Sequence, residues 1–303
     1  MPLALVVPET APLREAALAL LYSPLPHGPR EEQVAETLAA VARNELSLEN
    51  LVVALDGGQL RGAVLAVLRP GGAAFLWPPA VSAGTAIEDV SRALLEAVAA
   101  RVDDRQVQFT QCLLEPGDTA GRATLEGGGF PFATELILLS RPVATYQPSC
   151  TPTELWIQTY TPARHAAFSR IVERTYVGTL DCPILARIRG GEESLDAHRA
   201  TGQFVPNAWR IYRENDRDVG VLILAEHPER DTWEVAYLGV VPEARGRGIG
   251  RAILHEGLAL AQRSGRSTIE IAVDSANTPA LRLYRSVGFT DMRRFAVHLR
   301  VRQ

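Results

Sequence analysis

The sequence consists of two related halves, and this internal repeat constrains the fold more than any other feature. A Gly-Phe pair occurs at residues 129–130 and again at 288–289, which are 159 residues apart. The segment RALL at 92–95 matches RAIL at 251–254 with the same spacing. One spacing shared by separate segments indicates two copies of a single structural unit.

Both halves predict the same order of elements. Short apolar runs closed by glycine, asparagine or proline predict strands, and apolar residues at helical spacing predict helices. Two helices precede a hairpin, a third strand, a helix, a strand, a helix and a last strand. The fold class is therefore α/β, with domains at 1–145 and 152–303 joined by a proline-containing linker at 140–154. The elements are expected at 11–21, 31–43, 51–56, 60–68, 73–77, 87–102, 107–114, 119–126 and 134–139, and again at 163–174, 192–201, 209–213, 219–225, 233–241, 248–263, 268–273, 278–286 and 295–301.

The composition excludes several classes of protein. All 31 residues counted as Lys or Arg are arginine, so the chain has no lysine for a Schiff base or for a phosphate-binding P-loop. The three cysteines are widely spaced and no HExxH segment occurs, which argues against a disulfide framework and against a metal site. No apolar stretch approaches the roughly 20 residues that span a bilayer, and the amino-terminal segment lacks the basic flank of a signal peptide. We therefore expect a cytoplasmic protein that does not insert into membranes.

The charge is divided unevenly between the halves. The formal net charge of −4 combines −7 over residues 1–150 with +3 over residues 151–303. An acidic chain argues against nonspecific binding to nucleic acid. The more basic second half permits binding of a smaller anionic ligand there.

One segment of the second half has the composition of an anion site. Residues 240–251 read VVPEARGRGIGR and connect a predicted strand to an amphipathic helix. Glycine lets the backbone approach a ligand closely, and the exposed N–H groups at a helix N-terminus attract phosphate oxygens. Arg245, Arg247 and Arg251 add positive charge. A glycine-rich turn that binds nothing is the alternative, because short glycine motifs are weak signals by themselves.

Two motifs in this half resemble those of the GNAT superfamily of N-acetyltransferases. Arg245-x-x-Gly248-x-Gly250 is similar to the family's acetyl-CoA signature, Gln/Arg-x-x-Gly-x-Gly/Ala. Residues 277–289, NTPALRLYRSVGF, resemble its later Asn-x-x-Ala-x-x-Leu-Tyr-x-x-x-Gly-Phe element. The resemblance is close over about 209–289. It implies two tandem GNAT-like domains, each a mixed, mostly antiparallel sheet flanked by helices, with a degenerate N-terminal copy.

The resemblance also implies a role for each matching residue. The segment from Arg245 to Arg251 would hold the diphosphate of acetyl-CoA, the co-substrate, and the strand before it would pair with the pantetheine arm. Asn277 would bond that arm, while Arg285 would either reach a phosphate or remain a solvated helix charge. The implied cofactor-binding residues are Leu238, Val240, Arg245, Arg247, Gly248, Gly250, Arg251, Asn277, Tyr284 and Arg285.

Two side chains are candidates for acid–base chemistry. Glu234 lies six residues before Val240, where some members of the family carry a catalytic glutamate, and it would take a proton from an amine acceptor. Tyr284 would lie near the sulfur and act as the general acid toward the leaving thiolate. A solvent-facing strand glutamate and a tyrosine that caps the core are the alternatives.

Residues 176–183, YVGTLDCP, follow the first helix of the second copy, where this fold usually lines its acceptor site. Tyr176 and Asp181 are the candidate acceptor-binding residues, and Asp181 would pair with an amine. A turn residue before Pro183 is the alternative for Asp181. No histidine is visibly placed to activate Cys182, so this thiol is not expected to act as a nucleophile.

The first copy lacks the corresponding anion site. At the repeat spacing, Glu88 and Asp89 stand where the second copy has Arg247 and Gly248. Carboxylates repel phosphate, so the first copy is not expected to bind coenzyme A at this position. It would instead support the second domain or line the acceptor pocket.

Together these features predict an acetyl-CoA-dependent N-acetyltransferase, monomeric or homodimeric. A small-molecule or peptide amine would attack the thioester directly in a ternary complex. One alternative is transfer of another acyl group or transfer to a hydroxyl group. Tandem proteins of this fold also include mycothiol synthase and the aminoacyl transferases of cell-wall assembly, and the coenzyme A motif disfavours the latter. The other alternative is a noncatalytic protein that senses acyl-CoA.

Overall fold

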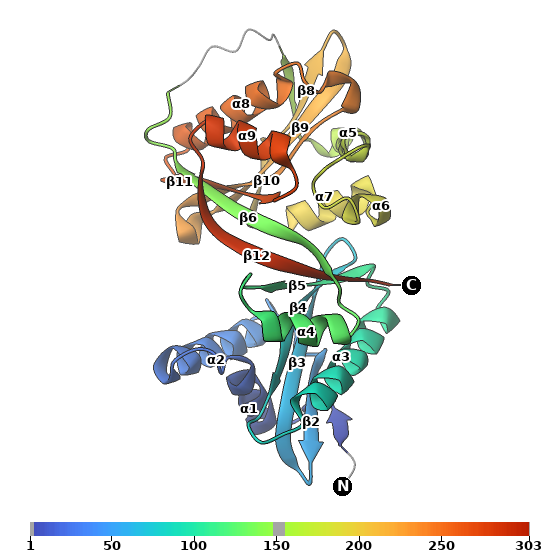
Figure 1. Ribbon diagram of the computed structural model, residues 1–303. Helices are drawn as coiled ribbons and strands as arrows, with labels where there is room; N and C mark the ends of the chain where they lie inside the picture. The colour runs from blue at the N-terminus through green and yellow to red at the C-terminus, as the bar shows by residue number, and fades with distance from the viewer. Residues whose placement is uncertain (1–2, 148–154, 303) are drawn as a thin grey trace. The chain divides into compact units, whose positions relative to one another are not determined.

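The computed structural model describes residues 3–147 and 155–302, which form two compact units (Figure 1). Unit 1 contains the chain up to Ala133 together with the residues from Ala296 onward, and unit 2 is Thr134–Phe295. Within the described ranges, no helix combines the length and the apolar composition needed to cross a bilayer. Each unit contains both helices and strands, and its buried apolar residues pack into clusters within that unit.

Unit 1 is built on a sheet in the order β1-β2-β3-β4-β5-β12. All neighbouring strands are antiparallel except β4 and β5, which are parallel. Helices α1 and α3 pack against this sheet. The elements are β1 (Ala4–Val6), α1 (Ala11–Leu21), α2 (His27–Ala42), β2 (Leu51–Asp56), β3 (Gln59–Arg69), β4 (Ala73–Val81), α3 (Ile87–Asp104), β5 (Phe109–Leu114), α4 (Thr119–Gly127) and the end of β12 (Thr290–Val301).

Unit 2 has the sheet order β6-β11-β10-β9-β8-β7, in which only β10 and β11 are parallel. Helices α5 and α8 both pack against β9 and β10. The elements are β6 (Phe132–Pro142), β7 (Trp156–Thr159), α5 (His165–Tyr176), α6 (Leu185–Ile188), α7 (Gly191–Arg199), β8 (Gln203–Glu214), β9 (Arg217–His227), β10 (Thr232–Val240), α8 (Ile249–Arg263), β11 (Thr268–Asp274) and α9 (Thr278–Ser286).

The two sequence copies exchange their last strands. In unit 2, β6 from the first copy pairs with β11, from Thr268↔Pro142 to Asp274↔Leu136. In unit 1, the end of β12 from the second copy pairs with β5, from Ala296↔Leu114 to Val301↔Phe109. The compact units are therefore not the same stretches of chain as the sequence copies 1–145 and 152–303.

The exchange also changes the interpretation of the predicted linker at 140–154. Its first residues, Ser140 to Pro142, belong to β6 and pair with β11. Pro148, Cys150 and Pro152 of that segment lie outside the described residues. Repeat spacing alone does not reveal the exchange, because it compares the order of elements and not their partners.

Two other elements differ from the prediction for reasons of proline chemistry. Helix α2 begins at His27 and not at residue 31, because Pro29 lies in its first turn, where a missing N–H costs nothing. Strand β8 begins at Gln203 and not at residue 209, although it contains Pro206. Its pairing with β9 shifts register between Phe204 and Trp209, and such an irregularity tolerates proline within a strand.

The exchange predicts that a residue near the carboxyl end of the chain stabilises the unit formed by the amino-terminal residues. Leu299 on β12 is 3% exposed, so Leu299→Ala should destabilise unit 1 by about 2–5 kcal/mol. Hydrogen exchange should report faster opening of β3 to β5, while β8 to β10 of unit 2 keep their protection. Met292→Ala on the same strand is the control, because Met292 is 56% exposed; equal effects of the two variants would contradict the prediction.

Candidate functional site

Two parallel strands separate in the middle of unit 2. β10 and β11 pair only from Thr232↔Thr268 to Val235↔Ile271. Beyond Val235, β10 shifts register against β9 and continues with it to Val240, while β11 continues with β6. The edge of β10 from Ala236 to Val240 that would face β11 therefore has no strand partner among the described residues. Free backbone edges of this kind can hydrogen-bond an extended ligand.

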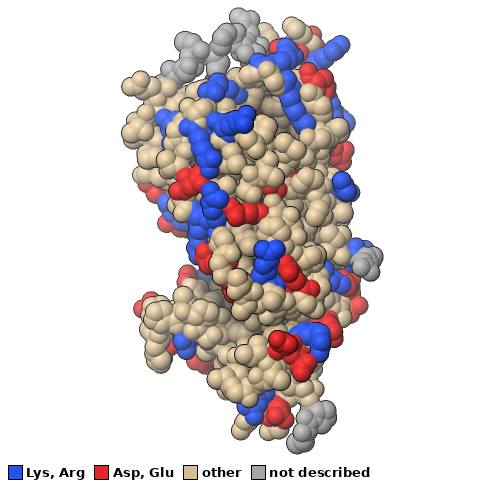
Figure 2. Space-filling model, in the orientation of Figure 1, with Lys and Arg blue, Asp and Glu red and all other residues tan. Residues whose placement is uncertain are grey.

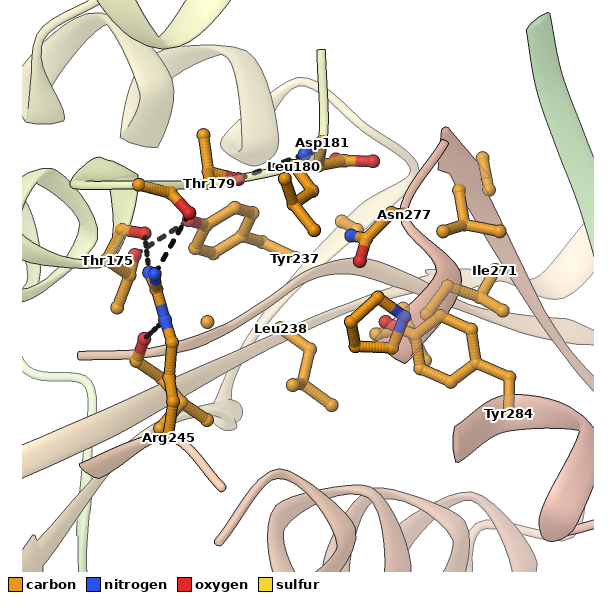
Figure 3. Close-up of a pocket in the computed structure, with 18 residues that line it drawn as sticks. Thr175, Thr179, Leu180, Asp181, Tyr237, Leu238, Arg245, Ile271, Asn277 and Tyr284 are labelled. Atoms are coloured by element: carbon orange, nitrogen blue, oxygen red, sulfur yellow. Dashed lines mark hydrogen bonds between the residues drawn. The ribbon is translucent and has the colours of Figure 1, made fainter. Parts of the chain in front are cut away.

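A pocket with a volume of about 200 Å³ occupies the opening between these strands (Figure 3). It brings together six of the predicted residues: Leu238, Val240, Arg245, Asn277, Tyr284 and Asp181. Arg245 and Tyr284 lie at opposite ends of the view in Figure 3. The lining also includes Thr175, Gly178, Thr179, Leu180, Val235, Ala236, Tyr237, Gly239, Ile271, Ala272, Val273 and Pro279.

The N-terminus of α8 follows β10 and is not capped by a side chain. Gly248 is the N-cap residue, with a left-handed φ of 82°, and no side chain accepts a hydrogen bond from the first turn. That turn also contains no acidic residue, and the helical hydrogen bonds begin with Ala252 N–H donating to the Gly248 carbonyl. The N–H groups of the predicted Gly248–Gly250 bend are thus available donors at the positive end of a helix dipole, which fits a diphosphate.

Arg245 differs from the sequence prediction in what its side chain contacts. Its guanidinium group donates hydrogen bonds to the carbonyls of Val240 (3.0 Å), Gly178 (3.1 Å) and Thr175 (2.8 Å) (Figure 3). The side chain therefore ties the loop after α5 to the end of β10 and shapes the mouth of the pocket. This guanidinium group was predicted to contact phosphate, but in the structure it donates its hydrogen bonds to backbone carbonyls.

The other predicted phosphate-binding arginines do not line the pocket. Arg247 forms an ion pair with Glu214 (2.8 Å), and Arg285 forms one with Asp291 (2.9 Å). Arg251 donates to the hydroxyl of Ser286 (2.9 Å) and has no carboxylate partner among the described residues. Figure 2 shows that arginine side chains gather on the face that α8 and α9 form in Figure 1. Arg251 is thus the best placed of the three to meet an anion beyond the pocket.

Helix α9 supplies the predicted asparagine and tyrosine. Asn277 caps this helix, since its side-chain oxygen accepts a hydrogen bond from Ala280 N–H (3.3 Å). Tyr284 is 6% exposed, and its hydroxyl has no hydrogen-bond partner among the described residues. Burial raises the pKa of Tyr284, and the charge of Asp181 adds to this effect. The phenol therefore stays protonated at neutral pH and can donate its proton within the pocket.

Asp181 and Asp274 connect the loop after α5 to the end of β11. Asp181 Oδ1 accepts a hydrogen bond from Asp274 N–H (3.0 Å), and Asp274 Oδ2 accepts one from Cys182 N–H (3.0 Å). Burial raises the pKa of Asp181, and the neighbouring charge of Asp274 acts in the same direction. Asp181 is thus both a pocket residue and part of a structural clamp. Burial also raises the pKa of the Cys182 thiol, so thiolate chemistry is disfavoured there.

This clamp gives a prediction for pH-dependent stability. Because the folded state raises the pKa of Asp181, the wild-type protein loses stability as the pH rises through that value and the carboxyl ionises beside Asp274. Asp181→Asn keeps an oxygen that can accept from Asp274 N–H but cannot ionise. We expect the variant to have a higher Tm than wild type at pH 8, and this difference to shrink as the pH falls toward 4. A higher wild-type Tm at pH 8 would contradict the prediction.

Tyr176 does not line the pocket but supports a residue that does. Its hydroxyl lies 2.6 Å from Ser194 Oγ, and its ring packs edge-on against Tyr237 at 5.9 Å between centroids. The Tyr237 hydroxyl in turn lies 2.7 Å from Thr175 Oγ1. Tyr176 of α5 and Tyr237 of β10 thus form an aromatic wall, which Ser194 of α7 and Thr175 of α5 hold through their hydroxyl groups. Tyr237 could not be recognised as a pocket residue from the sequence, because an isolated aromatic residue in a strand is usually a core residue.

Glu234 lies just outside the pocket, one residue before the point at which β10 and β11 separate. Its side chain is 30% exposed, and Oε2 lies 2.9 Å from His227 Nε2. In the parallel ladder Glu234 is in register with Glu270. The structure therefore does not bring Glu234 together with Tyr284 in a single pocket lining, although both flank the same opening of the sheet.

Three comparisons with known proteins show what this chain is similar to. The sequence model of the acetyltransferase (GNAT) family matches residues 173–289, which include the uncapped helix and the pocket. A mycothiol acetyltransferase from Thermomonospora curvata is 31% identical over 296 residues, covering 95% of this chain and 93% of that protein. This similarity extends over both sequence copies.

Solved structures show the same fold. A GCN5-related N-acetyltransferase from Sphaerobacter thermophilus superposes with a TM-score of 0.63 at 19% identity, covering 99% of this chain and 95% of that one. A tandem GNAT protein from the clavulanic acid biosynthesis pathway superposes with a TM-score of 0.53 at 15% identity, covering 99% and 98%. These structures confirm the predicted tandem α/β fold class. Because the Thermomonospora relative matches nearly the full length of both chains, the protein belongs to the GNAT family of acetyltransferases.

Proposed function

We propose that unit 2 transfers the acetyl group of acetyl-CoA to an amine by direct attack in a ternary complex. The observation that carries the proposal is the uncapped, acid-free N-terminus of α8 beside the unpaired edge of β10. The first-turn N–H groups would hold the diphosphate, with Arg251 contributing charge. Leu238 and Val240 would pair through their backbone with the pantetheine arm, and Asn277 would lie beside it.

The side chains at the opening of the sheet support acid–base roles in this reaction. Glu234 would take a proton from the attacking amine, and Tyr284 would give its proton to the leaving sulfur. The bound thioester supplies the activated acyl group. Asp181, at the rim of the pocket, would attract the acceptor amine, and the aromatic wall of Tyr176 and Tyr237 would exclude water from the acceptor side.

We also propose that the first copy supports the second and does not bind coenzyme A at the equivalent position. β4 and β5 separate beyond Phe75↔Gln111, as β10 and β11 do in unit 2. However, Pro79 stands at the position of Leu238 and has no N–H to offer a ligand. The first turn of α3 contains Glu88 and Asp89, whose charges oppose a diphosphate. Calorimetry on the full-length chain should therefore give one acetyl-CoA per chain.

The test is release of free thiol from acetyl-CoA in the presence of a panel of small-molecule and peptide amines. Turnover with at least one amine is expected, and calorimetry should detect binding of acetyl-CoA in its absence. No heat of binding would overturn the proposal. Binding without turnover on any acceptor would favour a noncatalytic acyl-CoA sensor, and turnover only with longer acyl chains or with alcohols would favour another acyltransferase. The cytoplasmic location stays a prediction of the sequence.

A second, narrower candidate acceptor follows from the similarity to the Thermomonospora protein. That protein is named a mycothiol acetyltransferase, and the match covers 93% of its length. Mycothiol lacking its acetyl group therefore belongs in the acceptor panel. A kcat/KM for it at least 10²-fold above that of simple amines would identify it as the preferred acceptor of this chain.

A further inference from the structure

A histidine lies between two carboxylates at the start of β10, next to the opening of the sheet. His227 is the last residue of β9, and its side chain is 12% exposed. Its Nε2 lies 2.9 Å from Glu234 Oε2, and its Nδ1 lies 3.4 Å from Glu229 Oε1. Glu229 belongs to the turn Pro228–Arg230 that connects β9 to β10. The imidazole therefore contacts one carboxylate through each ring nitrogen.

We infer that His227 is a positioning residue for Glu234, because its Nε2 contact fixes the direction of the carboxylate. This inference rests on the proposed role of Glu234 as the base. When Nε2 donates to Glu234 Oε2, the carboxylate can receive a proton from the acceptor only on its remaining lone pairs.

The surroundings of His227 restrict its ring. The turn between α7 and β8 packs over it so closely that a Cβ on Gly202 would lie 2.9 Å from Nε2. A glycine at this point allows the close approach. The ring is therefore held between the turn and the two glutamates, as a group that orients another group must be.

The other charged groups around the histidine are consistent with this role. A hydrogen bond from its own backbone, together with the charge of His227, holds the pKa of Glu229 below its usual range. Arg230 lies 4.0 Å from Glu234 and 3.2 Å from Glu270 on β11. Replacing His227 thus removes the contact with Glu234 at 2.9 Å, while Arg230 stays in place.

The test compares the steady-state kinetics of His227→Ala and His227→Gln with those of wild type. Alanine removes the contact with Glu234, while the amide of glutamine can still donate a hydrogen bond to it. We expect His227→Ala to lower kcat by about tenfold at an unchanged KM for acetyl-CoA, and His227→Gln to restore most of that loss. A wild-type kcat in His227→Ala, or an equal loss of kcat in both variants, would overturn the inference.

Two further variants separate this inference from the proposed role of Glu234. His165→Ala is the matched control, because His165 forms a similar pair with Glu192 (2.7 Å) away from the pocket, and its kcat should equal that of wild type. Glu234→Gln should reduce kcat without loss of acetyl-CoA binding. If Glu234→Gln keeps full activity, the proposed base is wrong and the inference is wrong too. If Glu234→Gln is inactive while His227→Ala keeps the wild-type kcat, only the inference fails.

Discussion

Tyr284→Phe should lower kcat by about 10²-fold or more and leave the affinity for acetyl-CoA nearly unchanged. The hydroxyl faces the pocket and has no partner among the described residues, so its removal leaves no other polar group unpaired. Phenylalanine keeps the ring that packs near Phe289 at 6.0 Å between centroids. The substitution therefore removes a proton donor and very little else. Steady-state kinetics and calorimetry with acetyl-CoA together measure both effects.

Tyr212→Phe is the control for this experiment. Tyr212 is also buried in the core of unit 2, but it does not line the pocket. Its variant should keep the wild-type kcat, whatever the small change in stability. A Tyr284→Phe enzyme with wild-type kcat would show that another group, or water, protonates the leaving sulfur, and the proposed acid would be wrong.

Gly248→Val should weaken binding of acetyl-CoA by about 10- to 100-fold. Gly248 has a φ of 82°, and a β-branched side chain is strongly disfavoured in this left-handed region. The bend must then change its backbone direction, which turns the first N–H groups of α8 away from the diphosphate. One lost hydrogen bond to a charged group is worth roughly 1.5–3 kcal/mol, which corresponds to that loss of affinity. Calorimetric titration of the variant measures it directly.

The same helix provides a matched control at its other end. Gly265 also has a φ of 82°, and at both glycines a Cβ would meet nothing within 4 Å. Gly265→Val therefore introduces the same backbone strain without touching the pocket. It should lower the thermal stability to a similar extent and keep the affinity for acetyl-CoA. Equal losses of affinity in the two variants would show that the bend acts through folding and not through contact with the diphosphate.

The bend at the start of α8 could be predicted because it depends on local backbone. A glycine in a left-handed N-cap position, followed by an amphipathic helix, needs only its own sequence to form a cradle of N–H groups. The same holds for Asn277, which caps the helix that carries Tyr284. The side-chain contacts of Arg245 could not be predicted in this way. Two of its three carbonyl partners, on α5 and in the loop after it, lie about 70 residues earlier in the chain.

The side-chain partners of Glu234 could not be predicted either, because they too depend on tertiary contacts. Its spacing from Val240 indicated a candidate base, but spacing along one strand does not reveal which side chains of the neighbouring turn meet it. His227, only seven residues away, becomes its partner because β9 and β10 form a hairpin. The aromatic pair of Tyr176 and Tyr237 likewise depends on how α5 packs against β10.

Local sequence patterns determine the order of elements, the two copies and the predicted anion-binding bend. Turns, caps and periodic apolar faces depend on residues that are near one another in the chain. The exchange of β6 and β12 and the clamp of Asp181 and Asp274 exist only in the folded molecule. Strand pairing and side-chain contact are long-range events, and their free energy depends on which edges and faces the packed units leave exposed. For this protein, the residues proposed to bind acetyl-CoA depend mainly on local sequence, and those proposed to position the acceptor and its base depend mainly on tertiary contacts.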